Sequence, residues 1–341
     1  MTYTPAARPL FWPLVPLYRL GIAINALRFR PGSPSVRRLH WPVVSVGNLS
    51  AGGAGKTPLA IALAKSLAAR GLHVDILSRG YGRSSKLPLS VNPDGTAEEF
   101  GDEPLLIARE TGVPVYVAAE RYDAGQLAEK ASPSISGVHI LDDGFQHRRL
   151  HRDIDILLLS RADLADHLLP AGNLREPTTA LIRAHVIAIP ADEPDIADYA
   201  RARGWNGEIW RLRRSMEIPG ISGPVAAFCG IARPGQFFHG LEASGLELAT
   251  RMAFPDHHRF TVLDLDRIAV ATRKSGGNAL LTTEKDRVRV GVLADALPPT
   301  LPLYSVALRT AIEDEHAAID WLTSRLAATQ AHVSRTLNSR L

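Results

Sequence analysis

The segment SVGNLSAGGAGKTPLAIALA, residues 45–64, limits what this chain can fold into more than any other feature. An apolar run, WPVVSVGN (41–48), enters it as a predicted strand, and LAIALAKSLAARG (59–71) follows with helical spacing. A glycine-rich loop between a strand and a helix, closed by Gly-Lys-Thr, is typical of phosphate-binding loops. Glycine N–H groups and the positive end of the helix dipole face the bound anion there. The chain departs from the usual pattern at Ser50, where the first glycine is expected.

This loop predicts a site for ATP and Mg²⁺. Lys56 can reach the β- and γ-phosphates, and the hydroxyl of Thr57 can bind the metal. The alternative is a glycine-rich turn in which Gly-Lys-Thr occurs by chance, and the flanking strand and helix disfavour it. The predicted nucleotide contacts are Ser50, Ala51, Gly52, Gly53, Ala54, Gly55, Lys56 and Thr57.

Further apolar runs alternate with helical stretches through the first part of the chain. They lack polar alternation, as parallel strands do when helices cover both faces of a sheet. The runs are 73–82, 114–119, 137–144, 153–160 and 185–191. Strand and helix in alternation predict an α/β fold, with a parallel sheet domain like that of phosphate-loop NTPases.

The pattern changes after residue 206. GEIWRLRRSMEI (207–218) alternates and is too charged for a central strand, so we expect an exposed connecting strand. Runs at 225–238, 279–286 and 302–310, followed by a helix over 313–329, predict a second, smaller α/β domain. The expected division is an N-terminal segment (1–40), a nucleotide-binding domain (41–206), a short β linker (207–222), the second domain (223–329) and a flexible tail (330–341).

Composition narrows the class of protein. The chain has 341 residues, 45% hydrophobic and 22% charged, which suits a globular protein of about two domains. Its one cysteine, Cys229, excludes a disulfide framework and indicates a reducing compartment. Residues 1–40 carry six arginines and no acidic residue, so the rest of the chain carries 4 − 6, a net −2. That distribution argues against a nucleic-acid partner, which would need a basic surface over the whole protein.

The basic N-terminus also holds an apolar run, LFWPLVPLYRLGIAINAL (10–27). It is marginal for a spanning helix and contains two prolines, and its basic cluster follows the apolar part, unlike a secretory signal. We expect residues 10–30 to meet a membrane surface, with arginines on anionic headgroups. A helix packed on the protein's own core or on a partner chain is the alternative, and whether the helix spans or lies on the membrane stays open.

LDDGFQH (141–147) ends an apolar strand with two adjacent carboxylates. In a phosphate-loop fold, a carboxylate at such a strand end holds Mg²⁺ or its water shell. Asp142 and Asp143 are therefore the candidate ligands, with Gln146 and His147 as supporting groups. A turn cap is the alternative, since Asp-Asp-Gly is also good turn chemistry.

Two short motifs are candidates for handling the acceptor proton. In GDEP (101–104), Asp102 either caps a helix or accepts a proton from an attacking hydroxyl, and spacing alone favours the cap. In FPDHHRF (254–260), His257 could orient or deprotonate a nucleophile, whereas surface histidines account for the pattern at least as well. The acid and cysteine pattern of a zinc site is missing there.

Two more motifs carry weaker signals. In LLPAGNLREP (168–177), Arg175 and Glu176 could face phosphate or metal. In TTEKD (282–286), Lys285 could neutralise charge at a polar strand end.

Taken together, these motifs resemble those of the tetraacyldisaccharide 4′-kinase family, the lipid A kinases of Gram-negative bacteria. The motifs occur in the same order as in the family and cover about residues 10–310. Most of them are weak evidence singly, but the set together is specific for the family. In that family the first glycine of the loop is commonly absent. The motifs are VGNLSAGGAGKTP, SRGYGR, GDEP, LDDGFQH with RRL, LLPAGNLREP, GIARPGQF, FPDHHRF and LTTEKD.

The resemblance implies that the γ-phosphate of ATP passes to the 4′-hydroxyl of a tetraacylated glucosamine disaccharide 1-phosphate. This glycolipid substrate would be met at the cytoplasmic face of the bacterial inner membrane. The family fold is two α/β/α domains joined by a two-stranded linker. The catalytic pair maps onto Asp102 and His257, with Lys56 in the loop. The metal and nucleotide region maps onto Thr57, Asp142, Asp143, Gln146 and Glu176.

Other classes fit part of the sequence. A membrane-associated phosphate-loop ATPase switch would hydrolyse nucleotide without a lipid acceptor. A scaffold with a decayed nucleotide site is disfavoured by the intact Gly-Lys-Thr, and a kinase for a soluble acceptor is disfavoured by the apolar N-terminus.

Overall fold

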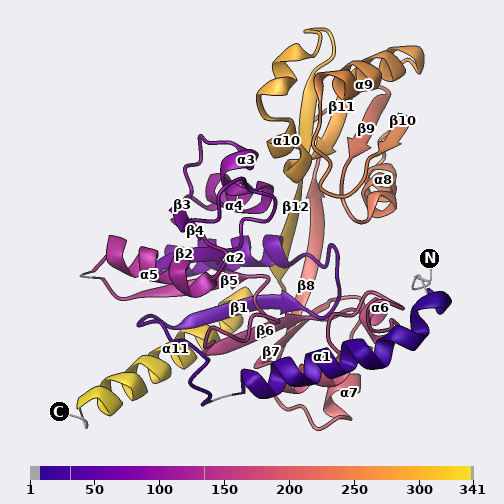
Figure 1. Cartoon of the computed structure of the whole chain (residues 1–341). Helices are drawn as coiled ribbons and strands as arrows, with labels where there is room; N and C mark the ends of the chain where they lie inside the picture. Colours follow the sequence, from indigo (N-terminus) through magenta and orange to yellow (C-terminus); the bar gives the residue numbers. More distant parts are fainter. Residues whose placement is uncertain (1–7, 31, 134, 339–341) are drawn as a thin grey trace.

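The computed structural model of the chain describes residues 8–30, 32–133 and 135–338 (Figure 1). Within them, twelve strands form one sheet in the order β10-β9-β11-β12-β8-β7-β6-β1-β5-β2-β4-β3. Neighbouring strands are parallel except in the pairs β8–β12 and β3–β4. The strands are β1 (Val43–Asn48), β2 (His73–Ser78), β3 (Leu89–Ser90), β4 (Val115–Val117), β5 (Gly137–Asp142), β6 (Ile154–Leu158), β7 (Val186–Pro190), β8 (Glu208–Glu217), β9 (Val225–Cys229), β10 (Leu248–Ala253), β11 (Ala279–Thr283) and β12 (Leu303–Ile312).

Strands β1 to β7 build what we call the large lobe, where helices cover both faces of the sheet. Along β6, Ile154, Ile156 and Leu158 pack with α2 on one face, whereas Leu157 packs on the other. Each strand therefore needs apolar residues at successive positions, which explains the unbroken apolar runs. The helices are α1 (Val15–Arg28), α2 (Lys56–Ala69), α3 (Ala97–Phe100), α4 (Asp102–Thr111), α5 (Arg121–Ala131), α6 (Arg161–Leu164), α7 (Asp195–Arg201), α8 (Pro234–Ala243), α9 (Val262–Lys274), α10 (Glu284–Val290) and α11 (Glu315–Asn338), with 3₁₀ turns η1 (Pro9–Leu14), η2 (Thr178–Arg183) and η3 (Gly291–Ala296).

Strands β9, β10 and β11 build the small lobe, which Figure 1 shows above the large one. Its sheet is also covered on both faces. Val225 and Ala227 of β9 pack with α8, while Ala226 and Phe228 pack with α9. The predicted α/β fold, with a phosphate-loop sheet and a second, smaller α/β unit, is confirmed.

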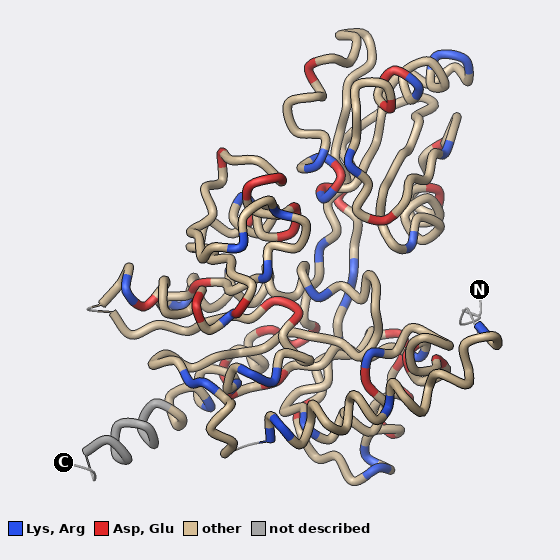
Figure 2. Tube along the Cα trace, in the orientation of Figure 1, with Lys and Arg blue, Asp and Glu red and all other residues tan. Residues whose placement is uncertain are grey.

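An antiparallel ribbon of β8 and β12 joins the two lobes, and Figure 2 shows Lys and Arg positions along it. Residues 208–212 of β8 pair with β7, and residues 212–217 pair with β12. Strand β12 in turn pairs with β11 through residues 303–306. The connecting strand expected over 207–218 is therefore present, and because it pairs on both sides the sheet runs unbroken from one lobe to the other.

The C-terminal helix differs from the expectation in two respects. Ile319, Leu322 and Leu326 of α11 pack in the core of the large lobe, so residues 313–329 do not belong with the second domain. The helix also continues to Asn338, which makes residues 330–338 helical where a flexible tail was expected; residues 339–341 lie outside the described residues. No glycine or proline occurs between residues 315 and 338, so the sequence holds no strong helix stop there.

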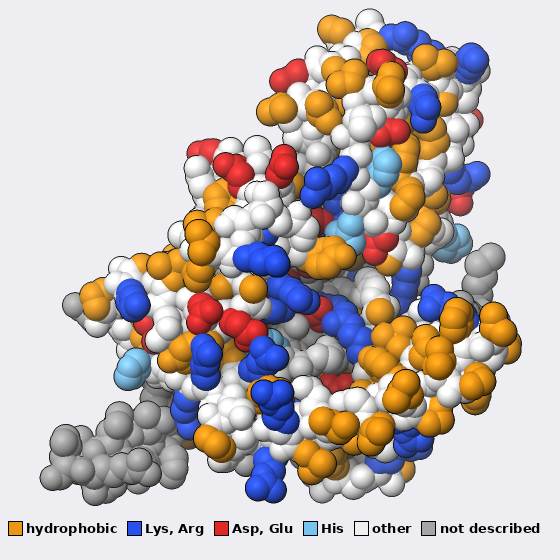
Figure 3. Space-filling model, viewed as in Figure 1, with side chains coloured by type: hydrophobic (Ala, Val, Ile, Leu, Met, Phe, Trp, Pro, Cys, Tyr) orange, Lys and Arg blue, Asp and Glu red, His pale blue; other side chains and the backbone are white. Residues whose placement is uncertain are grey.

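Helix α1 lies along the large lobe. Val15, Tyr18 and Ile22 pack on its core, and the Tyr18 hydroxyl donates a hydrogen bond of 3.1 Å to the Arg175 carbonyl. The opposite face is apolar too, and Figure 3 shows apolar side chains gathered along this helix. The exposed ones include Leu10, Leu17, Leu20, Ile24 and Leu27. Residues Pro9–Arg28, with a mean hydropathy of 1.4, are long and apolar enough to cross a membrane; residues 1–7 and 31 of the expected membrane segment lie outside the described residues.

Candidate active site

The glycine-rich loop connects the end of β1 to the start of α2. Gly52 and Gly55 adopt φ of 103° and 84°, a left-handed backbone that favours glycine. A Cβ at Gly55 would also lie 2.9 Å from Nη2 of Arg214, a β8 residue that donates a 2.5 Å hydrogen bond to the Ala54 carbonyl. Lys56 donates to Oδ1 of Asn48 at 2.9 Å. The loop is thus held from the strand before it and from the linker strand.

Ser50 has a structural place in this loop. It is buried, and the Asn48 amide donates to its carbonyl at 2.8 Å and to its hydroxyl at 3.0 Å. Its backbone forms an antiparallel bridge with Leu174, and its φ is not positive. No glycine is required here, because the turn that needs one begins at Gly52. Ser50 anchors the loop from behind, whereas residues 51–57 line the adjoining cavity.

Asp142 and Asp143 stand at the end of β5, which neighbours β1. Burial and the nearby carboxylates of Glu103 and Asp143 raise the pKa of Asp142 to about 7. Its Oδ1 is buried and has no hydrogen-bond partner among the described residues. Burial opposes ionisation of Asp143 as well, but the charges of Lys56 (3.4 Å) and Arg175 (2.9 Å) outweigh it and lower the pKa of Asp143. Of the two carboxylates, Asp142 is therefore the one without an ion pair among the described residues.

The described residues fit Mg²⁺ bound mainly through nucleotide. Thr57 and Asp142 line one cavity beside the loop, and Oδ1 of Asp142 is free of hydrogen-bond partners among the described residues. No group of three or more His, Cys, Asp or Glu able to hold a metal occurs in the described part of the chain. This agrees with Mg²⁺, which proteins usually hold by one or two carboxylates together with substrate phosphates and water.

Two predicted metal-region residues have other partners. The Glu176 carboxylate accepts hydrogen bonds from Arg148 at 2.8 Å and Arg183 at 3.1 Å, and it does not line the cavity. In this structure its carboxylate is taken up by the two arginines, and a place near the metal stays a prediction. Gln146 does line the cavity, but its amide donates to the Asn48 carbonyl at 2.8 Å, so it supports the loop.

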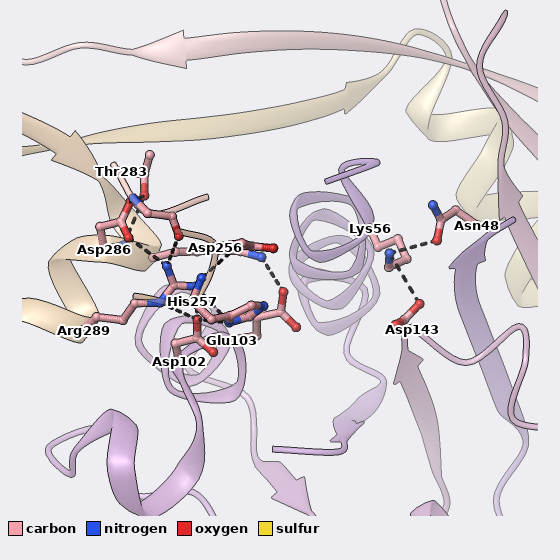
Figure 4. A network of polar contacts seen from close by, with 12 residues as sticks. Asn48, Lys56, Asp102, Glu103, Asp143, Asp256, His257, Thr283, Asp286 and Arg289 are labelled. Atoms are coloured by element: carbon pink, nitrogen blue, oxygen red, sulfur yellow. Dashed lines mark hydrogen bonds and ion pairs between the residues drawn. The ribbon is translucent and has the colours of Figure 1, made fainter. Parts of the chain in front are cut away.

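The structure brings Asp102 and His257 together although they come from different lobes (Figure 4). Asp102 is the first residue of α4, and Gly101 is the N-cap, so the Asp102 carboxylate does not cap the helix. His257 lies in the turn between β10 and α9. Its φ of 58° is uncommon for a residue other than glycine, which sets it apart from an ordinary surface histidine. Its Nδ1 lies 3.2 Å from Oδ2 of Asp102.

The environment pushes the two pKa values apart. Burial alone would raise the pKa of the Asp102 carboxyl, but the hydrogen bond to His257 and the charge of Arg289 hold it well below its usual range. The hydrogen bond to Asp102 raises the pKa of His257 against the effect of burial. At neutral pH Asp102 is therefore ionised, and His257 keeps its proton to a higher pH than an ordinary imidazole does.

Arg289, a residue that the motifs did not single out, completes this group. Its Nε donates to Asp102 at 2.7 Å, and its Nη1 donates to Asp286 at 2.8 Å. Its Nη2 also bonds Asp102 and lies 3.1 Å from Nδ1 of His257. Arginine only donates, so that last contact forms when Nδ1 is unprotonated, whereas bonding to Asp102 needs Nδ1–H. The one sequence hint was the position of Arg289 a helical turn after Asp286.

The TTEKD motif forms the base of this arrangement in the small lobe. Asp286 accepts hydrogen bonds from the Thr283 hydroxyl at 2.7 Å and from the Gly230 backbone at 3.0 Å, and it holds Arg289 in place. Lys285 crosses to the large lobe and pairs with Glu103. The motif therefore aligns the two lobes as well as neutralising charge.

A cavity of about 980 Å³ opens between the loop and the small lobe. Residues 51–57, Asp142 and His257 all line it. Among the described lining residues, lysine and arginine outnumber aspartate and glutamate by ten to six. Figure 3 shows the blue side chains gathered around the hollow between the lobes. Such a cavity suits anionic ligands.

A phosphate loop on a parallel sheet, a buried carboxylate on the next strand and a His–Asp pair across a cationic cavity define a phosphate-loop phosphotransferase. The sequence profile described as "Tetraacyldisaccharide-1-P 4'-kinase" matches residues 7–327. The chain belongs to this family of kinases.

Individual relatives support this family assignment. The tetraacyldisaccharide 4′-kinase of Koribacter versatilis is 42% identical over 319 residues, covering 90% of this chain and 96% of that protein. The enzyme of the same name from Polaromonas naphthalenivorans is 40% identical, over 84% of this chain and 82% of that one. A structure of LpxK from Aquifex aeolicus in complex with ATP covers 94% of this chain and 99% of its own, with a TM-score of 0.72 and 33% identity. The kinase assignment drawn from the motifs is confirmed, and the switch without an acceptor is not favoured.

Proposed function

We propose that this chain transfers the γ-phosphate of ATP to the 4′-hydroxyl of a tetraacylated glucosamine disaccharide 1-phosphate. The observation that carries the proposal is the shared cavity, into which both the phosphate loop and His257 project. The ATP complex of the LpxK relative supports ATP as donor, and the family description supports the acceptor.

The loop and its neighbours hold the donor. Backbone N–H groups of residues 51–57 and the N-terminus of α2 face the phosphates, and Lys56 neutralises charge on the transferring group. Asp143 and Asn48 hold the Lys56 ammonium in position. Thr57 and Asp142 would hold Mg²⁺, which when bound screens the phosphate oxygens and helps to stabilise charge in transfer.

His257 and Asp102 prepare the acceptor. Asp102 is a weak base because its carboxylate is ionised at low pH and bonded to Arg289. The pKa of His257 is raised, so its imidazole is the stronger base of the two, which suits a general base. The imidazole takes the hydroxyl proton through the nitrogen that Asp102 does not contact, while Asp102 bonds Nδ1–H and stabilises the imidazolium.

Helix α1 holds the protein at the cytoplasmic face of the inner membrane. Its outward face is apolar, with Leu17 and Ile24 68% and 57% exposed, and its other face is fixed to the large lobe. Asn25 and Phe29 at its C-terminal end line the same cavity as the phosphate loop. Acyl chains can therefore stay in the lipid while the sugars reach the loop.

Transfer of labelled γ-phosphate from ATP to the tetraacyldisaccharide 1-phosphate tests the chemistry, with the position of the new phosphate read by mass spectrometry. We expect one phosphate per acceptor, at position 4′, and none with Lys56→Ala. ATP hydrolysis at the same rate with and without acceptor, with no labelled lipid, would overturn the proposal in favour of an ATPase.

Vesicle flotation tests the membrane role. A variant with Leu17→Gln, Leu20→Gln and Ile24→Gln should lose binding to anionic vesicles while keeping its activity on detergent-dispersed acceptor. Unchanged flotation would contradict the role of this helix face.

A further inference from the structure

Arg309 lies on the ribbon between the lobes and contacts a carboxylate from each of them. It belongs to the part of β12 that pairs with β8, beyond the part that pairs with β11. Its Nη1 donates to the two carboxylate oxygens of Glu284, the first residue of α10, at 3.1 and 3.3 Å. Its Nη2 lies 3.2 Å from Oε2 of Glu110 in α4, and its Nε donates to Glu217 of β8 at 2.9 Å. One guanidinium therefore connects the small lobe, the large lobe and the ribbon.

Glu110 and Glu284 carry like charges from opposite lobes, and Arg309 allows both to be ionised. Burial raises the pKa of Glu284 to about 7; the charge of Arg309 opposes this shift, and that of Glu110 adds to it. Lys65 of α2, 3.5 Å from Glu110, is the other cation paired with either carboxylate among the described residues. The side chains of Glu284, Glu110 and Arg309 are 15%, 23% and 31% exposed, so water screens their charges less than on an open surface. Without Arg309, the two carboxylates would repel each other above the pKa of Glu284.

The charged groups around Glu284 come from the elements that pack against α10, which are α4, β11, β12 and η3. Helix α4 supplies Glu110 and strand β12 supplies Arg309, whereas β11 carries no charged residue. The other charged residues of these elements, two of which pair with cations of α10, are Asp102, Glu103, Arg109 and Asp295. Apart from burial, the protonation of Glu284 is thus governed by Arg309 and Glu110.

This group lies at the opposite end of α4 from the His–Asp pair. Asp102 begins the helix and Glu110 is its last residue but one, about 12 Å away along the axis. Figure 1 shows α10 near α4 and β12, against which it packs. Contacts near Asp102 alone would leave the two helices free to pivot about that point, whereas a second contact at Glu110 fixes the angle between them. The Arg309 group thus helps to keep Nδ1 of His257 3.2 Å from Asp102.

We propose that Arg309 is a positioning residue for phosphoryl transfer, which holds a carboxylate of each lobe and so keeps the His–Asp pair assembled. The inference rests on the proposed function, because that function assigns the acceptor proton to this pair. Arg309 does not line the cavity, so it acts without touching nucleotide or acceptor. Its effect therefore falls on kcat, since the His–Asp pair acts on the acceptor hydroxyl, and donor binding at the glycine loop is left unchanged.

The rate of transfer at two pH values tests this role in Arg309→Gln, with each rate divided by that of wild type at the same pH. At about pH 6, protonated Glu284 can donate a hydrogen bond to Glu110, so kcat should change little. At about pH 9 both carboxylates are ionised and repel each other, so kcat should fall about tenfold or more while the Kd for ATP is unchanged. Adding Glu284→Gln removes one of the two charges and should reverse the loss at the higher pH. Arg309→Lys keeps the cation and should lose less than Arg309→Gln there.

Glu217→Gln is the matched control, because Glu217 bonds the same guanidinium but lies on the ribbon and joins no lobe. It should match wild type at both pH values, and thermal melts check that all variants fold. No loss in Arg309→Gln at the higher pH would overturn the proposal. A loss that is equal at both pH values, or that Glu284→Gln does not reverse, would overturn it by assigning Arg309 to the fold, and a weakened Kd for ATP would assign Arg309 to the donor site. A wild type that transfers no phosphate would instead refute the proposed function.

Discussion

Nδ1 of His257 lies 3.2 Å from Oδ2 of Asp102, across the boundary between the two lobes. Neither lobe by itself holds both members of the pair that we propose for handling the acceptor proton. The contact depends on the small lobe keeping its present position against α4, which the Lys285–Glu103 pair and a 3.2 Å hydrogen bond from Arg259 to the Gly82 carbonyl support. In the proposed mechanism, proton transfer therefore depends on the position of the small lobe.

Removing either member of this pair should slow transfer without weakening donor binding. We expect Asp102→Asn and His257→Ala each to lower kcat by at least about 10²-fold, because the acceptor hydroxyl loses its base or its orientation. The Kd for ATP, measured by calorimetry, should change little. His239→Ala, an exposed histidine of the small lobe, is the matched control. Near-wild-type turnover in either variant would rule out the pair.

The pH profile should report the pKa of His257. A base must be neutral to act, so kcat/KM should fall as the pH drops through the raised pKa of this imidazole. Asp102→Asn removes the carboxylate that raises the pKa of His257. The acid limb of the profile should therefore move to lower pH, and the maximum kcat/KM should fall. Rates measured from about pH 5.5 to 9 check this. An acid limb that stays in place in Asp102→Asn would contradict the assignment.

Arg289 should act through its neighbours as a positioning residue. Arg289→Ala should lower kcat by about tenfold to a hundredfold, since buried Asp102 loses its main cation. The charge of Arg289 lowers the pKa of His257, so its removal should shift the acid limb to higher pH, opposite to Asp102→Asn. Arg287→Ala, whose side chain bonds only the Gly291 carbonyl among the described residues, should leave the profile unchanged. A loss of stability without a pH shift would mean a purely structural role.

Restoring the usual loop glycine should bring no benefit. Ser50→Gly removes the hydroxyl that accepts from Asn48, a hydrogen bond worth about 1 kcal/mol, and adds backbone freedom. We expect a lower thermal midpoint and an unchanged or weaker Kd for ATP. Tighter ATP binding in this variant would show that Ser50 weakens nucleotide binding in the wild type.

The stability of the protein should fall at alkaline pH because of a buried histidine far from the cavity. His139 is buried, with Nδ1 2.6 Å from Asp75 and its ring stacked 5.0 Å from Trp41. Burial opposes its charge, but Asp75 and Glu129 outweigh burial and raise the pKa of His139 to about 9. The resulting stabilisation is complete below the unfolded pKa of about 6.5 and is lost as pH rises through 9. Urea unfolding at both ends of this range should show the loss in wild type and much less of it in His139→Asn.

The sequence predicted local features well because neighbouring residues decide them. The strand, glycine loop and helix around Lys56 follow one another along the chain, so their pattern is visible without the fold. The same holds for the connecting strand, which is too charged for a core. Asp102 and His257 were candidates only: the spacing favoured a helix cap for one and the surface for the other, and their contact needs both lobes.

Contacts between residues far apart in the sequence could not be predicted from it. Arg289 meets Asp102 because α10 packs against α4, and Arg214 meets the loop because β8 crosses beside it; no spacing in the sequence shows either contact. The two arginine partners of Glu176 could not be predicted for the same reason, since Arg148 and Arg183 reach it only in the folded lobe.

The placement of α11 has a consequence for biosynthesis. This helix is translated after the small lobe, yet Ile319 and Leu322 share one hydrophobic core with Leu59 and Leu63 of α2, which is translated before it. While a ribosome is still making the small lobe, the nucleotide-binding part is left with a bare apolar face that nothing nearby in sequence can cover. A nonsense mutation within the small lobe would accordingly damage the earlier part as well, so truncated products would be substrates for proteolysis rather than idle ATP binders.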